Sequence, residues 1–271
     1  MIPPSPAASQ FLRDLILKSS AIVLDDQKDY LLQARLGPLI EREGMATWED
    51  LVKRLTSAGS QGLRQKVVES MTTHETSFFR DWHPFEAMQA HILPALAPES
   101  KKRPVHIWSA AASSGQEVYS LAFLAAQQAG MDLGRLRFVA TDISSEILAR
   151  AREARYSQLE VNRGLPARML VRFFDKQGID YRVKDEIRRL IDFKPLNLIE
   201  TWPSLPEMDV IFLRNVLIYF DVPTKRLIID RIARVLRKGG YLFLGGVEST
   251  VNLTDRFVEA HLGKTTCYRL S

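Results

Sequence analysis

The feature that most constrains the fold is the stretch Val105–Ser120, which reads VHIWSAAASSGQEVYS. It begins with a short apolar run, residues 105–108, that is typical of a buried strand in a parallel sheet. Small residues follow at 109–115, and a helical pattern of apolar positions starts near Glu117. A strand, a turn of small residues and a helix form the first unit of a doubly wound sheet. In such a sheet a ligand lies against the turn, because small side chains let the backbone approach it closely.

A second buried strand is predicted at Arg137–Ala140, and Asp142 stands just past its end. An acidic side chain at this place is suited to hold the ribose of a nucleoside cofactor, because a carboxylate accepts hydrogen bonds from both ribose hydroxyls. Asp142 could instead cap the following helix, a role that Ser144 could also fill. The turn contains Gly115 alone and not the GxGxxG pattern, so an α/β protein with no ligand at this turn is the competing interpretation.

The chain before this stretch is predicted to contain no strand. Residues 1–72 are interpreted as a small all-helical N-terminal domain, because four amphipathic helical patterns follow one another between about residues 9 and 70. Thr47 is the predicted N-cap of the third helix, and Pro38 is expected to kink or break the second. Residues 73–90, which contain the aromatic pair Phe78–Phe79, are interpreted as a linker docked on a domain surface.

Residues 91–271 are interpreted as a second domain of the α/β class, with a mostly parallel, doubly wound sheet. Further buried strands are predicted at 191–194, 208–213 and 241–244, and a closing antiparallel hairpin at 257–270. Residues from about 156 to 192 break the alternation of strands and helices and predict a small inserted antiparallel subdomain. The closing hairpin matches S-adenosylmethionine-dependent methyltransferases better than NAD enzymes, which is an analogy of fold.

Polar residues follow the ends of successive predicted strands. Asp142, Asn197 and the pair Arg214–Asn215 each come directly after such a strand. The carboxyl ends of parallel strands meet at one rim of the sheet, and open α/β sheets bind their ligands there. The sequence therefore predicts a ligand site at this rim.

Charge and composition restrict the setting of the protein. The net charge is +5, and residues 150–194 hold twelve Arg or Lys against seven Asp or Glu, which accounts for the whole excess. This segment could meet an anionic partner, although scattered solvated charge is the simpler interpretation. The single cysteine excludes an internal disulfide, and no metal-ligand spacing is present. We expect a cytoplasmic protein, because neither a secretory signal nor an apolar run of ~20 residues is found.

Several motifs together resemble one known family. They are TTHETSFFRD, SAAASSGQEVYS, ATDIS, the NL of KPLNL, FLRNVLIYFD and KGGYLFLGGVES. This combination resembles the chemotaxis receptor (protein-glutamate) O-methyltransferases, the CheR family, from the helical N-terminal part to near the end of the chain. The resemblance implies methyl transfer from S-adenosylmethionine to glutamate side-chain carboxylates of chemoreceptor cytoplasmic helices. The products would be S-adenosylhomocysteine and glutamate methyl esters for chemotaxis adaptation, and no metal would be needed.

The resemblance also implies the site residues. Catalytic roles fall on Arg80 and Tyr219. His74 stands where many members have Asn, and its imidazole can still donate or accept one hydrogen bond. The implied cofactor contacts are His74, Thr76, Arg80, Glu117, Asp142, Asn197, Leu198, Arg214 and Asn215.

The implied partner is the methylation region of chemoreceptors, whose helices carry acidic clusters. Basic side chains would dock there by charge. In some members the inserted subdomain grips a pentapeptide at the receptor's C-terminal tail. The loop Asp175–Asp180 looks shorter here, so we expect docking without this tether, by a monomer that neither binds nucleic acid nor inserts into a membrane. The docking candidates are Arg35, Arg42, Arg163, Arg168, Arg172, Arg182, Arg188 and Arg189.

Three other functions match parts of the sequence. A nucleic-acid methyltransferase would suit the basic charge, but Arg214-Asn215-Val216 replaces the Asn/Asp-Pro-Pro-aromatic clamp expected after the 208–213 strand. A non-catalytic S-adenosylmethionine-binding regulator is a second alternative, against which Arg80 and Tyr219 argue weakly. An NAD-dependent oxidoreductase is disfavoured by the lone Gly115 and the closing hairpin.

Overall fold

The computed structural model describes residues 3–24 and 29–271 and divides the chain into two compact units. The first unit comprises residues 1–73 with 219–224, and the second comprises 74–218 with 225–271. Residues 74–90, which the sequence analysis sets apart as a linker, belong to the second unit. Within the described ranges, no helix has both the length and the apolar character needed to cross a bilayer.

The first unit is built from helices, as the sequence predicts. Its helices are α1 (Pro6–Ser20), α2 (Asp29–Arg42), α3 (Trp48–Thr56) and α4 (Gln61–Met71). Thr47 is the N-cap of α3 and forms a capping box with Asp50, in which each side chain accepts from the other residue's backbone N–H. The apolar faces meet in one core, in which Leu12, Ile16 and Leu36 are fully buried.

The predicted break at Pro38 is wrong, because α2 continues through it. Packing against α4 offsets the backbone hydrogen bond that a proline lacks. Arg35 reinforces this contact by donating to the carbonyl oxygens of Met71 and Thr72, at 2.5 and 3.1 Å, and to Thr73 Oγ1 at 2.9 Å. A guanidinium at this helix end satisfies carbonyls that have no partner within the helix. Arg35 is therefore used inside the helical unit.

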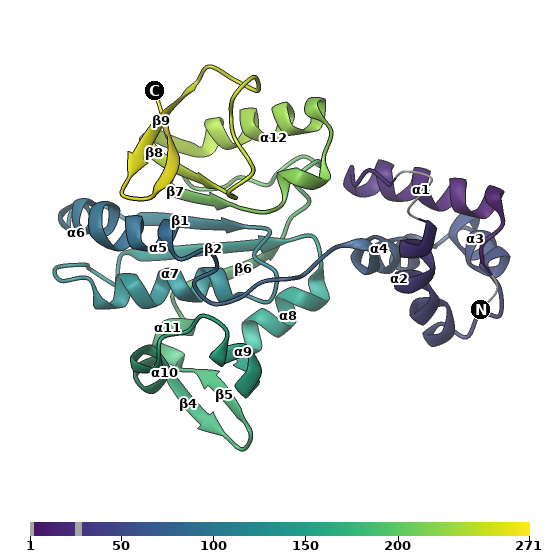
Figure 1. Cartoon of the computed structure of the whole chain (residues 1–271), viewed down its shortest axis with the longest axis horizontal. Helices are drawn as coiled ribbons and strands as arrows, with labels where there is room; N and C mark the ends of the chain where they lie inside the picture. Colours follow the sequence, from purple (N-terminus) through teal and green to yellow (C-terminus); the bar gives the residue numbers. More distant parts are fainter. Residues whose placement is uncertain (1–2, 25–28) are drawn as a thin grey trace. The chain divides into compact units, whose positions relative to one another are not determined.

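The second unit contains a seven-stranded sheet in the order β6-β2-β1-β7-β8-β10-β9 (Figure 1). The strands are β1 (Val105–Ala110), β2 (Leu136–Asp142), β6 (Ile191–Pro195), β7 (Met208–Leu213), β8 (Leu236–Leu244), β9 (Phe257–Leu262) and β10 (Thr265–Leu270). The neighbours from β6 to β8 are parallel, whereas β10 pairs antiparallel with both β8 and β9. The mostly parallel sheet and the closing hairpin are thus confirmed.

The order of the strands places the helices and the ligand rim. From β1 the chain proceeds outward through β2 to β6, and then returns to the other side of β1 for β7 and β8. Right-handed crossovers in opposite directions put their helices on opposite faces of the sheet. These helices are α7 (Gln116–Gln127) and α8 (Ser145–Glu153) for the first half and α12 (Val222–Val235) for the second. The helices α5 (His83–Ala87), η2 (Met88–Ile92) and α6 (Leu93–Ser100) precede β1.

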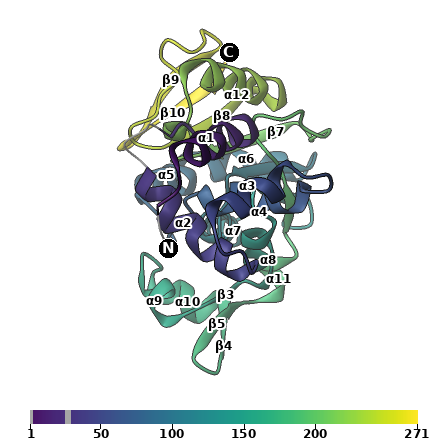
Figure 2. The same cartoon turned by 90° about the vertical axis from the view of Figure 1, so that its right-hand side faces the viewer.

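The inserted subdomain is a three-stranded antiparallel sheet in the order β3-β5-β4. In both views β4 and β5 project away from the main sheet (Figures 1 and 2). A two-residue turn, Gly178–Ile179, joins β4 to β5. The elements are β3 (Arg155–Tyr156), α9 (Gln158–Asn162), α10 (Ala167–Phe173), β4 (Phe174–Gln177), β5 (Asp180–Val183) and α11 (Asp185–Arg188).

Aromatic side chains join this insert to the segment before α5. Phe78 is fully buried, with Tyr156 and Phe174 edge-on at 5.0 and 5.7 Å between ring centroids. A Cβ atom at Gly164 would collide with the carbonyl oxygen of Phe78, so the chains approach as closely as only glycine allows. The aromatic pair Phe78–Phe79 therefore belongs to the core of the second unit.

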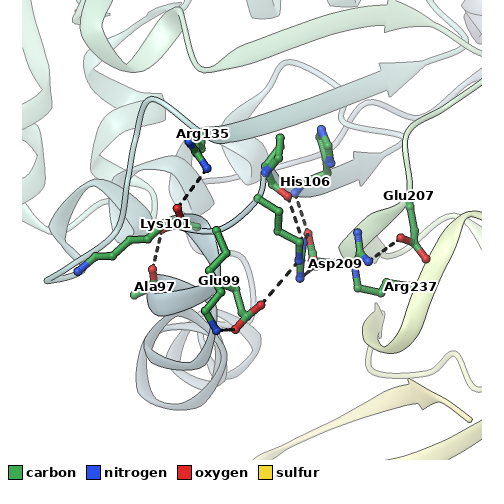
Figure 3. Close-up of polar contacts among 12 residues, drawn as sticks. Ala97, Glu99, Lys101, His106, Arg135, Glu207, Asp209 and Arg237 are labelled. Atoms are coloured by element: carbon green, nitrogen blue, oxygen red, sulfur yellow. Dashed lines mark hydrogen bonds and ion pairs between the residues drawn. The ribbon is translucent and has the colours of Figure 1, made fainter.

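A buried carboxylate fastens the sheet near the amino ends of its strands (Figure 3). Asp209, the second residue of β7, is 3% exposed. Its Oδ1 and Oδ2 accept from both terminal nitrogens of Arg103, at 2.7 and 3.1 Å, and Oδ1 also accepts from Nε of Arg237 at 3.1 Å. The backbone N–H of His106 donates to Oδ2 at 2.9 Å. This network lies away from the ligand rim and serves the fold.

Candidate cofactor-binding site

The carboxyl ends of the parallel strands bring the predicted residues to one rim. Ala110 at the end of β1 is in register with Thr141 of β2 and Leu213 of β7, and Asp142 is in register with Pro195 of β6. The strand order reverses between β1 and β7, and open α/β sheets bind their ligands at such a point. All nine predicted cofactor contacts lie in this second unit.

The turn after β1 has an unusual backbone. Ala111, Ser113 and Gly115 have φ angles of 58°, 51° and 93°, in the left-handed region that side chains disfavour. A Cβ atom at Gly115 would lie 3.1 Å from Cβ of Ala151 and 3.2 Å from the hydroxyl of Tyr156, so the position requires glycine. Strained backbone of this kind persists at functional sites when the surroundings hold it.

Hydrogen bonds from three directions hold this turn. The N–H of Ala112 donates to the carbonyl of Thr141 at 2.8 Å. The hydroxyl of Ser113 donates to the carbonyl of His74 at 3.0 Å. From the insert, the fully buried Tyr156 donates its hydroxyl to the carbonyl of Ser114 at 2.7 Å. The turn is thus a pre-formed cradle of small residues.

Asp142 closes the cradle from β2. Its carboxylate accepts from the N–H groups of Ser113 and Ser144 at 2.9 and 3.0 Å, and the residue is 6% exposed. Ser144 caps α8, since its hydroxyl accepts from Ile147 N–H at 3.2 Å, so Asp142 is free of that role. Burial raises the pKa of Asp142, while the backbone hydrogen bonds and the nearby His74 act in the opposite direction. Each of its oxygens retains lone-pair capacity for a ligand hydroxyl.

Arg214 forms the centre of a buried charge network. Its side chain is 2% exposed, and it donates from Nη1 to Oε2 of Glu117 at 3.0 Å and from Nη2 to Oδ2 of Asp81 at 2.7 Å. The hydroxyl of Ser109 holds the other oxygen of Glu117 at 2.8 Å. Among the described residues, Nε of Arg214 is buried without a hydrogen-bond partner. A buried donor left without a partner is costly and destabilises the fold at this point.

Arg80 contributes to this network through its backbone. Its carbonyl accepts from Nη2 of Arg214 at 3.0 Å, whereas its own Nη1 donates to the carbonyl of Glu75 at 2.9 Å. The neighbouring Phe79, Asp81 and Trp82 have φ angles of 52°, 63° and 35°. The segment therefore turns sharply beside the site, and the guanidinium of Arg80 is held near its own loop.

The residues after β6 flank Asp142. The N–H of Leu196 donates to the carbonyl of Asp142 at 2.9 Å, and Oδ1 of Asn197 accepts from the N–H of Ile199 at 3.2 Å. Leu198 is buried, and its carbonyl accepts from Trp202 and Arg231. This segment is therefore tied down beside the cradle.

The remaining predicted residues differ in how far the structure places them. His74 touches the cradle through its backbone and lies close enough to Asp142 to affect its pKa. Thr76 is half-buried in the same segment. Tyr219 ends the 3₁₀ helix η3 (Leu217–Tyr219) and belongs to the helical unit, in which its carbonyl accepts from Val23 N–H at 3.4 Å.

Glu248 is a site residue that the sequence analysis does not single out. Its carboxylate follows β8 and accepts from the N–H groups of Asn215, Val216 and Gly245 at 2.8, 2.9 and 2.6 Å. A Cβ atom at Gly245 would lie 2.6 Å from Oε2 of Glu248, so the contact depends on that glycine. Asn215 has a φ of 57°, and Glu248 holds this strained position. An acid after a paired glycine at a strand's carboxyl end is the sequence pattern that points to it.

A cavity of about 570 Å³ opens beside Arg214. Asp81 and His83 line one side, the residues from Leu244 to Ser249 another, and Lys264 of the closing hairpin a third. Charged groups of both signs and glycine backbone thus surround this space.

Comparison with protein families identifies the family of this chain. The profile described as CheR methyltransferase, SAM binding domain, matches residues 74–265, and the profile described as CheR methyltransferase, all-alpha domain, matches residues 7–72. This chain belongs to the CheR methyltransferase family.

Named relatives agree with this CheR assignment. Chemotaxis protein methyltransferase 1 of Pseudomonas aeruginosa is 40% identical over 265 residues, covering 96% of each chain. Chemotaxis protein methyltransferase 1 of Vibrio cholerae is 41% identical over 253 residues, covering 92% of this chain and 91% of the relative. The chemotaxis protein methyltransferase of Escherichia coli is 34% identical over 275 residues, covering 98% and 92%.

The rim of this CheR chain fits S-adenosylmethionine. The turn at Gly115 consists of small residues, which let a cofactor approach the backbone closely. Asp142 offers acceptor oxygens for ribose beside this turn. Among the residues that the structure describes, His, Cys, Asp and Glu side chains form no group of three that could hold a metal ion.

Proposed function

We propose that this chain transfers the methyl group of S-adenosylmethionine to glutamate side-chain carboxylates of chemoreceptor helices, forming methyl esters. The observation that carries the proposal is the pre-formed turn after β1, beside which the carboxylate of Asp142 is held with oxygens that can accept from ribose hydroxyls. The names of the relatives, chemotaxis protein methyltransferases, support the choice of receptor as substrate.

The reaction needs little acid–base catalysis from the protein. When bound, S-adenosylmethionine supplies a methyl group on a positively charged sulfur, and an in-line displacement breaks the sulfur–methyl bond as an oxygen–methyl bond forms. A glutamate with a pKa near ~4.3 is already an anion at neutral pH and needs no general base. The protein's contribution is to hold oxygen and carbon at roughly 3–3.5 Å and to exclude water.

We assign the residues of the rim accordingly. Asp142 accepts from the ribose hydroxyls, and Glu117 holds the amino-acid end of the cofactor. His74, Thr76, Asn197, Leu198 and Asn215 complete the contacts, and Asn215 depends on Glu248 for its position. Arg80 positions the cofactor and the incoming carboxylate, and the hydroxyl of Tyr219 lines the methyl-transfer cleft.

The receptor would dock by charge. Arg42 on α2, Arg168 and Arg172 on α10, and Arg189 after α11 are exposed and could face acidic clusters on receptor helices. Arg163 already forms an exposed ion pair with Glu75 at 2.7 Å. The turn Gly178–Ile179 is as short as a hairpin allows, which supports docking without a pentapeptide tether. We propose that the enzyme acts as a monomer in the cytoplasm.

The experiment uses purified enzyme, methyl-labelled S-adenosylmethionine and membranes carrying chemoreceptors. We expect label on the receptor band, and mild alkali should release it as volatile methanol because methyl esters are alkali-labile. The matched enzyme control is Asp142→Ala, which should lose both cofactor binding and labelling.

A second control replaces the receptor's methyl-accepting glutamates by alanine, which should abolish the label. Alkali-stable label would instead indicate methylation of nitrogen and would overturn the proposal. Cofactor binding without any label on several receptors would favour a regulator.

A further inference from the structure

A second cavity, separate from the cofactor rim, is lined almost entirely by arginine. It has a volume of about 550 Å³, and its lining consists of Arg152, Glu153, Arg155, Arg182 and Arg188. Arg152 and Glu153 come from the end of α8, Arg155 from β3, Arg182 from β5 and Arg188 from α11. The cavity thus brings together four cations and one anion beside the inserted subdomain, whose strands β4 and β5 project from the main sheet in Figure 1.

The four guanidiniums are anchored rather than freely solvated. Nη2 of Arg152 donates to the carbonyl of Phe193 at 2.6 Å, and Nη2 of Arg188 donates to the carbonyl of Arg152 at 3.0 Å. Nε of Arg182 donates to the carbonyl of Glu153 at 3.3 Å, and Nη2 of Arg155 donates to Oε1 of Gln177 at 3.0 Å. These neutral acceptors fix the side chains but neutralise none of their charge. Anchoring lowers the entropy that each side chain loses when it binds a ligand.

The strand register forces two of these charges together. Arg155 on β3 is directly opposite Arg182 on β5, and like charges at such positions are destabilising. Asp175 faces Arg182 from β4, but among the described residues the only ion pair made by the four arginines joins Arg188 to Asp185. The cavity therefore carries uncompensated positive charge that a bound anion would neutralise.

We propose that this cavity binds the phosphate group of a small ligand, such as a diphosphate or a nucleoside diphosphate. Planar guanidinium groups pair with phosphate oxygens through two parallel hydrogen bonds, which makes arginine the preferred residue for this recognition. A concave site of this volume suits a phosphorylated small molecule better than an extended acidic chain, which needs a groove. The site is independent of the proposed methyl transfer and stands or fails separately.

The test measures binding of inorganic pyrophosphate, and of adenosine diphosphate, to the full chain by calorimetry. Sulfate and chloride at the same ionic strength are the reference salts. We expect saturable binding of pyrophosphate with one site per chain. Arg155→Gln and Arg182→Gln should each weaken it about tenfold to hundredfold, since each removes hydrogen bonds between charged groups. Arg168→Gln, which removes the same charge from exposed α10 outside the cavity, should leave the affinity unchanged.

Two further arms separate the sources of the phosphate. Binding to vesicles of phosphatidic acid in phosphatidylcholine would indicate a lipid headgroup, and binding to soluble pyrophosphate would indicate a free ligand. Either result supports the site if the binding is lost when Arg155 or Arg182 is replaced. Equal weak binding of sulfate and pyrophosphate, or equal loss in Arg168→Gln, would mean unspecific charge attraction and would overturn the proposal. Binding of an oligoglutamate peptide with no response to phosphate would likewise reject it in favour of an acidic protein partner.

Discussion

Nη1 of Arg214 lies 3.0 Å from Oε2 of Glu117, which joins the segment after β7 to the first turn of α7. The guanidinium is 2% exposed and the carboxylate 12%, so this pair is screened little by solvent. The same arginine reaches Asp81 and the carbonyl of Arg80. One side chain thereby fixes three segments that meet at the cofactor rim.

Glu117→Gln should weaken this junction. An amide cannot balance the buried guanidinium, and the loss of one charge-assisted hydrogen bond lowers the free energy of unfolding by about 1.5–3 kcal/mol. Urea unfolding measures the change, and calorimetry with S-adenosylhomocysteine should show weaker binding as well. Glu186→Gln, at an exposed position of α11, is the control and should match the unmodified protein. Equal stability of both variants would contradict the role given to the pair.

Gly115→Ala should both destabilise the protein and weaken cofactor binding. The residue has a φ of 93°, and an added Cβ would press on Ala151 and Tyr156 at 3.1 and 3.2 Å. Strain of this kind costs about 1–3 kcal/mol. Gly62→Ala gives the contrast, because Gly62 lies inside α4 with nothing within 4 Å of an added Cβ. That variant should be stabilised by about 0.5–1 kcal/mol. Thermal unfolding of both variants tests whether their melting temperatures shift in opposite directions.

Cofactor affinity should fall in acid at a higher pH than an ordinary aspartate would predict. Burial raises the pKa of Asp142 above 3.8, and only the carboxylate form accepts from both ribose hydroxyls. The same shift means that folding is favoured by protonation of Asp142, and this contribution is lost as pH rises through the unfolded and then the folded pKa. Titration calorimetry with S-adenosylhomocysteine between pH 8 and about pH 4.5 measures the first effect. Asp142→Asn should bind weakly with a flat profile; a profile unchanged from that of the parent protein would assign the titration to another group.

Glu248→Gln should impair turnover through the loop it holds. The carboxylate accepts from the N–H groups of Asn215 and Val216, and its loss releases a backbone position with a φ of 57°. We expect the free energy of unfolding to fall by about 1.5–3 kcal/mol. The rate of receptor methylation should also fall in the fraction that stays folded. Glu259→Gln, in the same cavity but exposed, should be silent. An unchanged methylation rate in Glu248→Gln would show that Asn215 and Val216 keep their backbone conformation without this carboxylate.

Substitutions at Asp209 and at its neighbour Glu207 should lower the free energy of unfolding by different amounts. Asp209→Ala removes the charge-assisted hydrogen bonds from Arg103 and Arg237 and should cost about 1.5–3 kcal/mol. Glu207→Gln removes a surface ion pair with Arg237 and should cost about 0–1 kcal/mol. Chemical unfolding measures both variants. Because the network lies away from the rim, cofactor affinity of the folded protein should stay unchanged in each, and a change in affinity would contradict that separation.

The main features of the fold follow from local sequence patterns. Apolar runs such as Met208–Leu213 locate the parallel strands, because a strand buried on both faces has no polar alternation. Pro38 shows the limit, since packing of α2 against α4 outweighed the local cost of a proline. Propensity is a weak guide where tertiary contacts decide.

The sequence predicts the position of a site residue when that residue directly follows a strand. It does not predict the position of a residue that is held by a contact distant in the sequence. Asp142 and Arg214 follow their strands, so topology alone brings them to the rim. The contact of Arg35 with Met71 joins residues more than thirty positions apart and leaves no local pattern, and the paired glycine that points to Glu248 does not reveal its distant partner Asn215. For the same reason, the orientation of the Arg80 side chain toward Glu75 is visible only in three dimensions.

The hydroxyl of Tyr156 binds the carbonyl of Ser114, although Tyr156 is the first residue of the predicted insert. The insert is consequently no detachable module: a graft that exchanges it between relatives must keep a phenol at this one position or lose the shape of the cofactor turn. Recombination points placed after Ser157 would leave the turn intact, whereas points placed before Tyr156 would cut its support. Ile179, which is 87% exposed at the turn of the far hairpin, is by contrast free to diverge.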